Sequence, residues 1–150
     1  MKTIFTLLFS VFAFQAFATC PQVTGKYLCP KELEWDLIFE SPRIEIKEVD
    51  FFGYKIFSLK SDKSNVFYIL NEWAPYMDEL NEIMHNDVGT SAVCKKNELH
   101  LKLKILPPEE ENNEDPFIMT YKISPLKEGI KVNVFMEDQL AVSAKCKKLP

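Results

Sequence analysis

Alternation of apolar and polar residues is the strongest pattern in this chain, and it predicts a mainly β fold. Residues 99–106, LHLKLKIL, alternate strictly, and residues 43–49, RIEIKEV, place Ile44 and Ile46 on one face of a strand. Comparable runs, bounded by turn residues, cover residues 24–29, 54–59, 66–70, 90–95, 117–123, 130–135 and 139–147. We therefore expect about eight or nine strands, each joined to the next by a short turn.

One stretch has a different period. Apolar residues recur at helical spacing at Trp73, Tyr76, Met77, Leu80, Ile83 and Met84. Pro75 suits the first turn of a helix, so the pattern predicts one short amphipathic helix over residues 75–85, inserted between strands. A second stretch, residues 33–40, fits both a strand and a helix.

The order of the predicted elements favours an antiparallel meander, because short sequential hairpins pair neighbouring strands. A sheet of this many strands usually curls or closes, since closure removes exposed edges. The fold class expected is therefore a barrel or a strongly curled sheet. Closure would place the last strand beside the first, which would bring Cys146 near Cys20 or Cys29.

Residues 1–18, MKTIFTLLFSVFAFQAFA, have the features of a secretory signal peptide: Lys2, an apolar run and an Ala-x-Ala cleavage site. The apolar run is too short for a membrane span, and no other stretch could form one. We therefore expect a single mature domain, residues 19–150, in the periplasm or outside the cell. Lipidation of Cys20 fits poorly, because Thr19 and Phe17 occupy the positions where a lipobox has a small residue and Leu.

The chain has four cysteines, all beyond residue 18: Cys20, Cys29, Cys94 and Cys146. An even number in an exported chain predicts two disulfides. Zinc ligation would need closely paired ligands, which these spacings do not give, so no metal site is expected. A strand over residues 23–29 would hold Cys20 and Cys29 too far apart for a bridge, which favours bridges from this segment to Cys94 and Cys146.

The composition bears on the class of partner. The chain has 22 acidic and 18 basic residues, and loss of Lys2 with the signal peptide changes the net charge from −4 to −5. We expect no binding to nucleic acid, because phosphate groups would be repelled. A hydrophobic content of 47% argues against disorder.

The segment Gly25-Lys26-Tyr27, followed by a meander, resembles the first strand of the lipocalin-like (calycin) barrels, which begins Gly-x-Trp. Tyr27 takes the place of the Trp, there is no Thr-Asp-Tyr motif, and no long helix follows the last strand. The resemblance implies a lipocalin-like barrel with an aromatic residue at its floor and a small apolar ligand. The spacing of Cys20 and Cys29 around this segment also resembles small secreted bacterial proteins of uncharacterised function.

Catalytic chemistry has little support in the sequence. The two histidines, His85 and His100, are each expected to be solvated surface residues. There is no Gly-x-Ser-x-Gly or His-Glu-x-x-His motif. Residues 107–116, PPEEENNEDP, lack the glycine and alternating ligands of a calcium loop, so they are interpreted as a solvated acidic hairpin loop. We expect neither enzyme activity nor a cofactor.

Aromatic residues give the candidate binding site. Trp35, Trp73, Tyr76 and Met77 fit packing in a core or against a helix, but Phe51 and Phe52 lie in a predicted turn, where both cannot point into a core. We expect ligand-binding residues Phe51, Phe52, Trp73 and Tyr76 at a barrel mouth. The function expected is an exported, non-enzymatic binding protein for a small apolar ligand. The alternative is an inhibitor or accessory protein that contacts a protein partner through surface loops, including residues 107–116.

Overall fold

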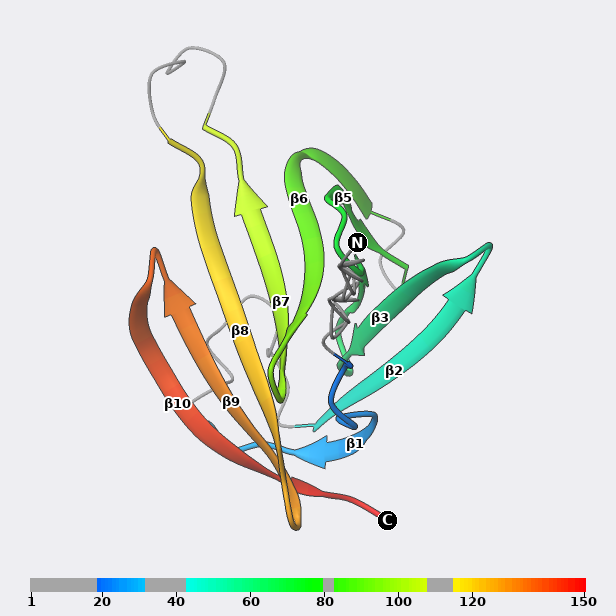
Figure 1. Cartoon of the computed structure of the whole chain (residues 1–150). Coiled ribbons are helices and arrows are strands. Elements are labelled where there is room, and N and C mark those ends of the chain that lie inside the picture. The colour runs from blue at the N-terminus through cyan, green and yellow to red at the C-terminus, as the bar shows by residue number, and fades with distance from the viewer. Residues whose placement is uncertain (1–18, 32–42, 80–82, 108–114) are drawn as a thin grey trace, which may run out of the picture.

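Ten antiparallel strands make up most of the described chain and close into a barrel (Figure 1). The computed structural model describes residues 19–31, 43–79, 83–107 and 115–150. The strands are β1 (Gly25–Leu28), β2 (Arg43–Phe51), β3 (Tyr54–Lys60), β4 (Asn65–Ile69), β5 (Ala74–Asp78), β6 (Ile83–Lys95), β7 (Glu98–Ile105), β8 (Phe117–Leu126), β9 (Gly129–Met136) and β10 (Gln139–Lys148). Each pairs with its neighbours in sequence, and β10 returns to β1. The predicted antiparallel meander and its closure are confirmed.

Some predictions concern residues outside this description. The signal peptide at residues 1–18, the ambiguous stretch at 33–40 and most of the acidic loop lie outside the described residues. Within the described residues, no helix is long and apolar enough to cross a membrane.

The predicted helix over residues 75–85 is wrong, because strands β5 and β6 occupy both of its ends. Burial alternates along β5: Pro75 and Met77 are exposed, Tyr76 is half-buried and Asp78 is buried. The Asp78 carboxylate accepts a hydrogen bond from the Asn65 backbone N–H at 2.9 Å, which ties β5 to β4. The apolar residues at helical spacing belong to two strands, β5 and β6, so their apparent period does not come from one element.

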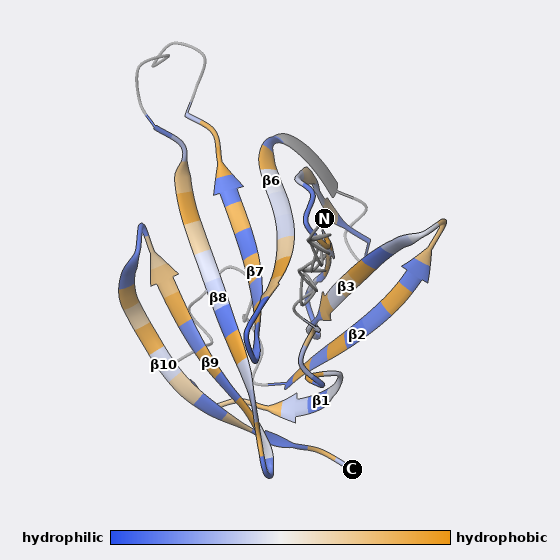
Figure 2. Ribbon diagram, viewed as in Figure 1, coloured by the Kyte–Doolittle hydropathy of each residue, from blue (hydrophilic) through white to orange (hydrophobic). Residues whose placement is uncertain are grey.

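The core consists of the side chains that alternate inward from the strands. Figure 2 shows this alternation as hydrophobic and hydrophilic bands along β7 to β10. The largest fully buried side chains are Tyr27, Tyr68, Tyr121, Phe57, Ile46, Leu59, Leu99, Leu101 and Ile123. Three buried tyrosines and a phenylalanine therefore occupy much of the interior.

Tyr27 is the residue that the lipocalin-like resemblance places at the barrel floor. It is 2% exposed, and its hydroxyl donates a hydrogen bond to the Val23 carbonyl at 2.7 Å. Burial raises the pKa of this hydroxyl. Tyr27 thus anchors the segment that precedes β1 to the core.

Two disulfides connect the N-terminal segment to distant strands, as predicted. Cys20 pairs with Cys94 of β6, and Cys29 pairs with Cys146 of β10, across 74 and 117 residues of sequence. Both bonds are consistent with an oxidising compartment. The second bridge lies where β1 meets β10 and reinforces the closure of the barrel.

The strand pairing through which β1 closes the barrel involves few residues. β1 pairs with four residues of β2, from Arg43 to Ile46, and with only Lys147 and Lys148 of β10. Beyond Ile46, β2 continues to Phe51 and pairs with β3 alone among the described strands. The β2–β3 hairpin therefore extends past the part of the barrel that β1 closes, and Figure 1 shows it projecting from the body of the sheet.

Candidate binding surface

The tip of the β2–β3 hairpin is a two-residue turn with an unusual residue in it. Phe52 and Gly53 have φ angles of 48° and 84°, the combination of a type I′ turn. Such turns favour Asn, Asp or Gly, and a bulky residue with positive φ is uncommon. Phe52 is nevertheless 89% exposed, so burial of its ring does not compensate for this backbone conformation.

The rings of Phe51 and Phe52 contact each other at the tip. Their centroids are 4.5 Å apart and their planes are inclined by 81°, an edge-to-face arrangement. Phe51 is 58% exposed. The two adjacent aromatic residues that the sequence singled out thus form one exposed pair, with solvent around much of their surface.

Apolar side chains continue from this tip over the outer face of the sheet. Cross-strand pairs join Phe51 to Tyr54, Val49 to Ile56 and Ile56 to Ile69 on the outer face. We call this surface the apolar face; it consists of Val49, Phe51, Phe52, Tyr54, Ile56, Phe67 and Ile69. Val49 and Tyr54 are 46% and 48% exposed, and the last three residues are half-buried. Exposed apolar patches are common at interaction sites, so this face is the candidate binding surface.

Strands β7 to β10, on the other side of the barrel, have a more polar outer surface. The outward positions of β7 to β10 include five lysines among the described residues: Lys102, Lys104, Lys122, Lys131 and Lys145. Lys131 and Lys145 are directly paired across strands. Four of the ten large hydrophobic residues that are exposed in the described chain lie together on the β2–β3 hairpin: Val49, Phe51, Phe52 and Tyr54. The tip of this hairpin is coloured as hydrophobic in Figure 2.

The other two predicted ligand-binding residues lie in different surroundings. Trp73 is 45% exposed; the Lys104 ammonium group lies 4.7 Å from the centre of its ring, and its edge approaches Gly89 of β6. Tyr76 is half-buried and packs against the hydrophobic core from β5. The structure brings Phe51 and Phe52 together, and it places Trp73 directly before β5 and Tyr76 within β5, each with contacts of its own.

Sequence reasoning missed five residues of the apolar face: Val49, Tyr54, Ile56, Phe67 and Ile69. A signal for them exists in β2, where the apolar residues change face along the strand. Ile44 and Ile46 occupy one face, whereas Val49 and Phe51 occupy the other. A strand whose apolar residues switch faces contributes to the core at one end and presents apolar surface at the other.

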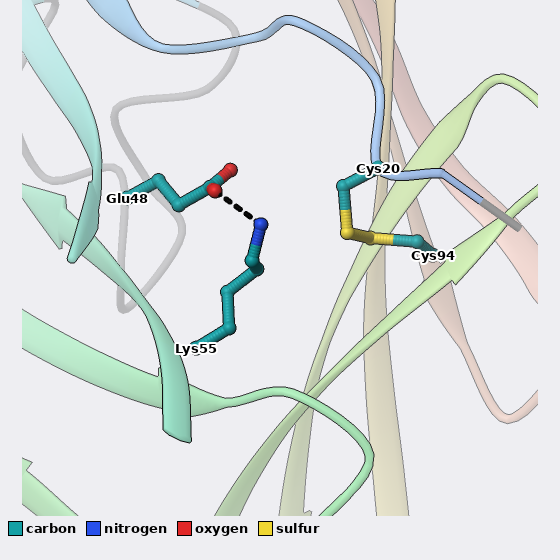
Figure 3. Close-up of a disulfide and its surroundings, with 4 residues drawn as sticks. All are labelled: Cys20, Glu48, Lys55 and Cys94. Atoms are coloured by element: carbon teal, nitrogen blue, oxygen red, sulfur yellow. Dashed lines mark hydrogen bonds and ion pairs between the residues drawn. A yellow bond between two sulfur atoms is a disulfide. The ribbon is translucent and has the colours of Figure 1, made fainter. Parts of the chain in front are cut away.

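The inner side of the same hairpin is charged. The Lys55 ammonium group forms a hydrogen-bonded ion pair with the Glu48 carboxylate, and this bond raises the pKa of Lys55. Asp50 is the cross-strand partner of Lys55 and adds to the negative charge around it. Figure 3 shows Glu48 and Lys55 pointing towards each other on the side of the hairpin that faces the Cys20–Cys94 disulfide.

His100 is buried, which contradicts the expectation of a solvated surface histidine. It is 7% exposed, and its Nε2 lies 3.0 Å from a carboxylate oxygen of Glu98. The other oxygen of Glu98 accepts a hydrogen bond from the Ser124 hydroxyl at 3.1 Å. The carboxylate lies between serine and histidine, so the imidazole does not contact the hydroxyl as it would in a Ser-His-Asp triad. His85 falls in β6, paired with Tyr76, and not at the end of a helix.

The Glu98 interactions predict a component of acid sensitivity. The hydrogen bond with His100, assisted by that from Ser124, lowers the pKa of the Glu98 carboxyl in the folded state. Stability from this group is therefore present above the unfolded-state pKa, about 4.3, and is lost as pH falls through the lower folded value. The effect is small, because the Glu98 side chain is 37% exposed to solvent. Unfolding free energy measured from pH 6 to 3, roughly spanning that window, should fall more steeply in the wild type than in Glu98→Gln; parallel curves would contradict this assignment.

The part of the chain that the structure describes contains no candidate metal site. No group of three or more His, Cys, Asp or Glu side chains there is placed to hold a metal ion. The acidic residues at positions 109, 110, 111 and 114 lie outside the described residues.

Comparison of the chain with protein-family models, curated proteins and solved structures finds no match in any of the three. The candidate site is therefore defined by the geometry and chemistry of its own residues.

Proposed function

We propose that the mature chain is an exported protein-interaction factor that binds a protein partner through the apolar face of β2, β3 and β4. The first 18 residues act as its signal peptide, and the domain works in the periplasm or outside the cell, where its two disulfides are stable. It belongs to the accessory or inhibitor type of binding protein and performs no catalysis.

The observation that carries this proposal is the conformation and exposure of Phe52. Among the described residues, the other non-glycine residues with positive φ are Asn71, Lys96, Glu137 and Asp138, all of which are polar. A phenylalanine in this conformation costs about 1 kcal/mol in the isolated fold and exposes a large apolar ring. A partner that covers the ring would recover that cost through burial of apolar surface.

Partner binding is better supported than an apolar ligand inside a lipocalin-like barrel. The inward positions are occupied by large buried side chains, including Phe57, Tyr68 and Tyr121. Phe51 and Val49, in contrast, point outward and are half exposed or more. Exposed aromatic side chains are the residue type that most often anchors protein interfaces.

Native mass spectrometry of the protein purified from its own compartment without reductant tests the proposal. We expect a complex of one chain with one protein partner, which dissociates on denaturation to a chain whose two disulfides make it about 4 Da lighter than the reduced form. A bound small molecule in place of a protein would instead support the ligand-binding barrel. A complex with the mass of two copies of the chain would show that the chain binds itself and not a different protein.

A further inference from the structure

Among the described residues, the part of β2 that borders the apolar face is a sheet edge with no strand paired to it. β1 pairs with β2 only as far as Ile46, because the chain preceding Gly25 leaves the sheet and joins β6 through Cys20. From Lys47 to Phe51, no described strand pairs with the side of β2 that faces away from β3. These five residues are all exposed.

Hairpin geometry identifies which backbone groups are free on this edge. A two-residue turn makes Phe51 and Tyr54 a hydrogen-bonded pair, so Val49 and Lys47, at alternate positions, also bond towards β3. The N–H and C=O groups of Glu48 and Asp50 therefore point away from β3. They continue the row in which Ile46 pairs with Gly25 of β1. An unpaired row of this kind is a template for another strand.

A groove runs along this edge. Its volume is about 510 Å³, and it is lined by Gln22, Thr24 and Gly25 on one side and by residues 45–49 of β2 on the other. The N-terminal segment forms the wall opposite β2, and the edge of β2 forms the near wall. The groove is therefore placed where an additional strand would lie.

We propose that the partner binds by strand addition: an extended segment of the partner protein pairs with β2 at Glu48 and Asp50. This inference rests on the proposed function and specifies its mode. Side chains of the added strand on the outer face would lie beside Val49 and Phe51, which favours apolar residues there. Side chains on the inner face would lie beside Glu48 and Asp50, two carboxylates that share the single ammonium group of Lys55. The segment that fits alternates apolar and basic residues.

Panning of phage-displayed random linear peptides on the full mature chain tests this mode of binding. We expect enrichment of peptides that alternate apolar and basic residues. Asp50→Pro removes one free N–H of the edge without removing a hydrogen bond to β3, and proline is tolerated at such edge positions. Asp50→Ala is the matched control, because it removes the same carboxylate and keeps the N–H. Enriched peptides should bind Asp50→Ala with the affinity they have for the wild type, except for peptides whose basic residue lies opposite the lost carboxylate. Their affinity for Asp50→Pro should be about tenfold or more lower.

The outcomes separate the two proposals. Equal binding to Asp50→Pro and Asp50→Ala, or no enrichment, overturns strand addition. If peptides lose affinity for Phe52→Asn but not for Asp50→Pro, the apolar face remains the docking surface and strand addition fails. Should Asp50→Pro fail to fold, hydrogen exchange in the wild type decides: an added peptide must protect the Glu48 and Asp50 amides, and unchanged exchange overturns the inference.

Discussion

Removal of the Cys29–Cys146 disulfide is expected to destabilise the fold by about 2–4 kcal/mol. The bridge spans 117 residues of sequence and joins the two strands whose pairing closes the barrel. β1 and β10 share only two cross-strand pairs, Tyr27 with Lys148 and Leu28 with Lys147, so little else holds them together. Denaturant unfolding of the Cys29→Ala/Cys146→Ala double variant, with the other disulfide intact, measures the loss.

The Cys20→Ala/Cys94→Ala double variant is the control for this prediction. It removes a bridge that ties residues preceding β1 to β6 and leaves the β1–β10 seam linked. Hydrogen exchange of the Leu28 and Lys147 amides, which face each other across the seam, should accelerate strongly without the Cys29–Cys146 bridge and much less without Cys20–Cys94. Equal protection of these amides in both variants would show that the seam does not depend on its own disulfide.

The sequence predicted the fold where one period was unambiguous. Residues 99–106 alternate over their whole length, and β7 forms there with Leu99, Leu101 and Leu103 buried. The pairing of β10 with β1 followed from the number of strands and the position of Cys146. The prediction failed at residues 75–85, because the apolar residues at helical spacing there belong to two different strands, β5 and β6.

The candidate site was predictable only in part. Two adjacent phenylalanines in a turn indicated an exposed pair, but the positive φ of Phe52 and the apolar residues contributed by β3 and β4 depend on strand register. The free edge of β2 depends on where β1 leaves the sheet, which no local pattern specifies. The burial of His100 likewise depends on neighbours that cross-strand pairing brings close, such as Lys122 of β8.

Phe52→Asn is expected to stabilise the isolated protein and to weaken partner binding about thirtyfold or more. Asparagine is favoured in type I′ turns, so relief of the positive φ should raise the unfolding free energy by about 1 kcal/mol. The same change removes the most exposed ring of the apolar face. Loss of a central aromatic anchor commonly costs 2 kcal/mol or more in binding, about a thirtyfold weakening.

Leu140→Asn is the matched control, because Leu140 is 56% exposed on β10, outside the apolar face. It should leave both the complex and its affinity unchanged.

The decisive measurement is therefore made on one purified variant with two readouts. Thermal or denaturant unfolding of Phe52→Asn gives its stability, and native mass spectrometry after purification from the protein's own compartment gives the fraction of chain in complex. The account predicts a variant that is more stable than the wild type and recovered with a much smaller fraction in complex. A Phe52→Asn variant that keeps the same partner at the same occupancy would contradict the role of the β2–β3 tip in binding.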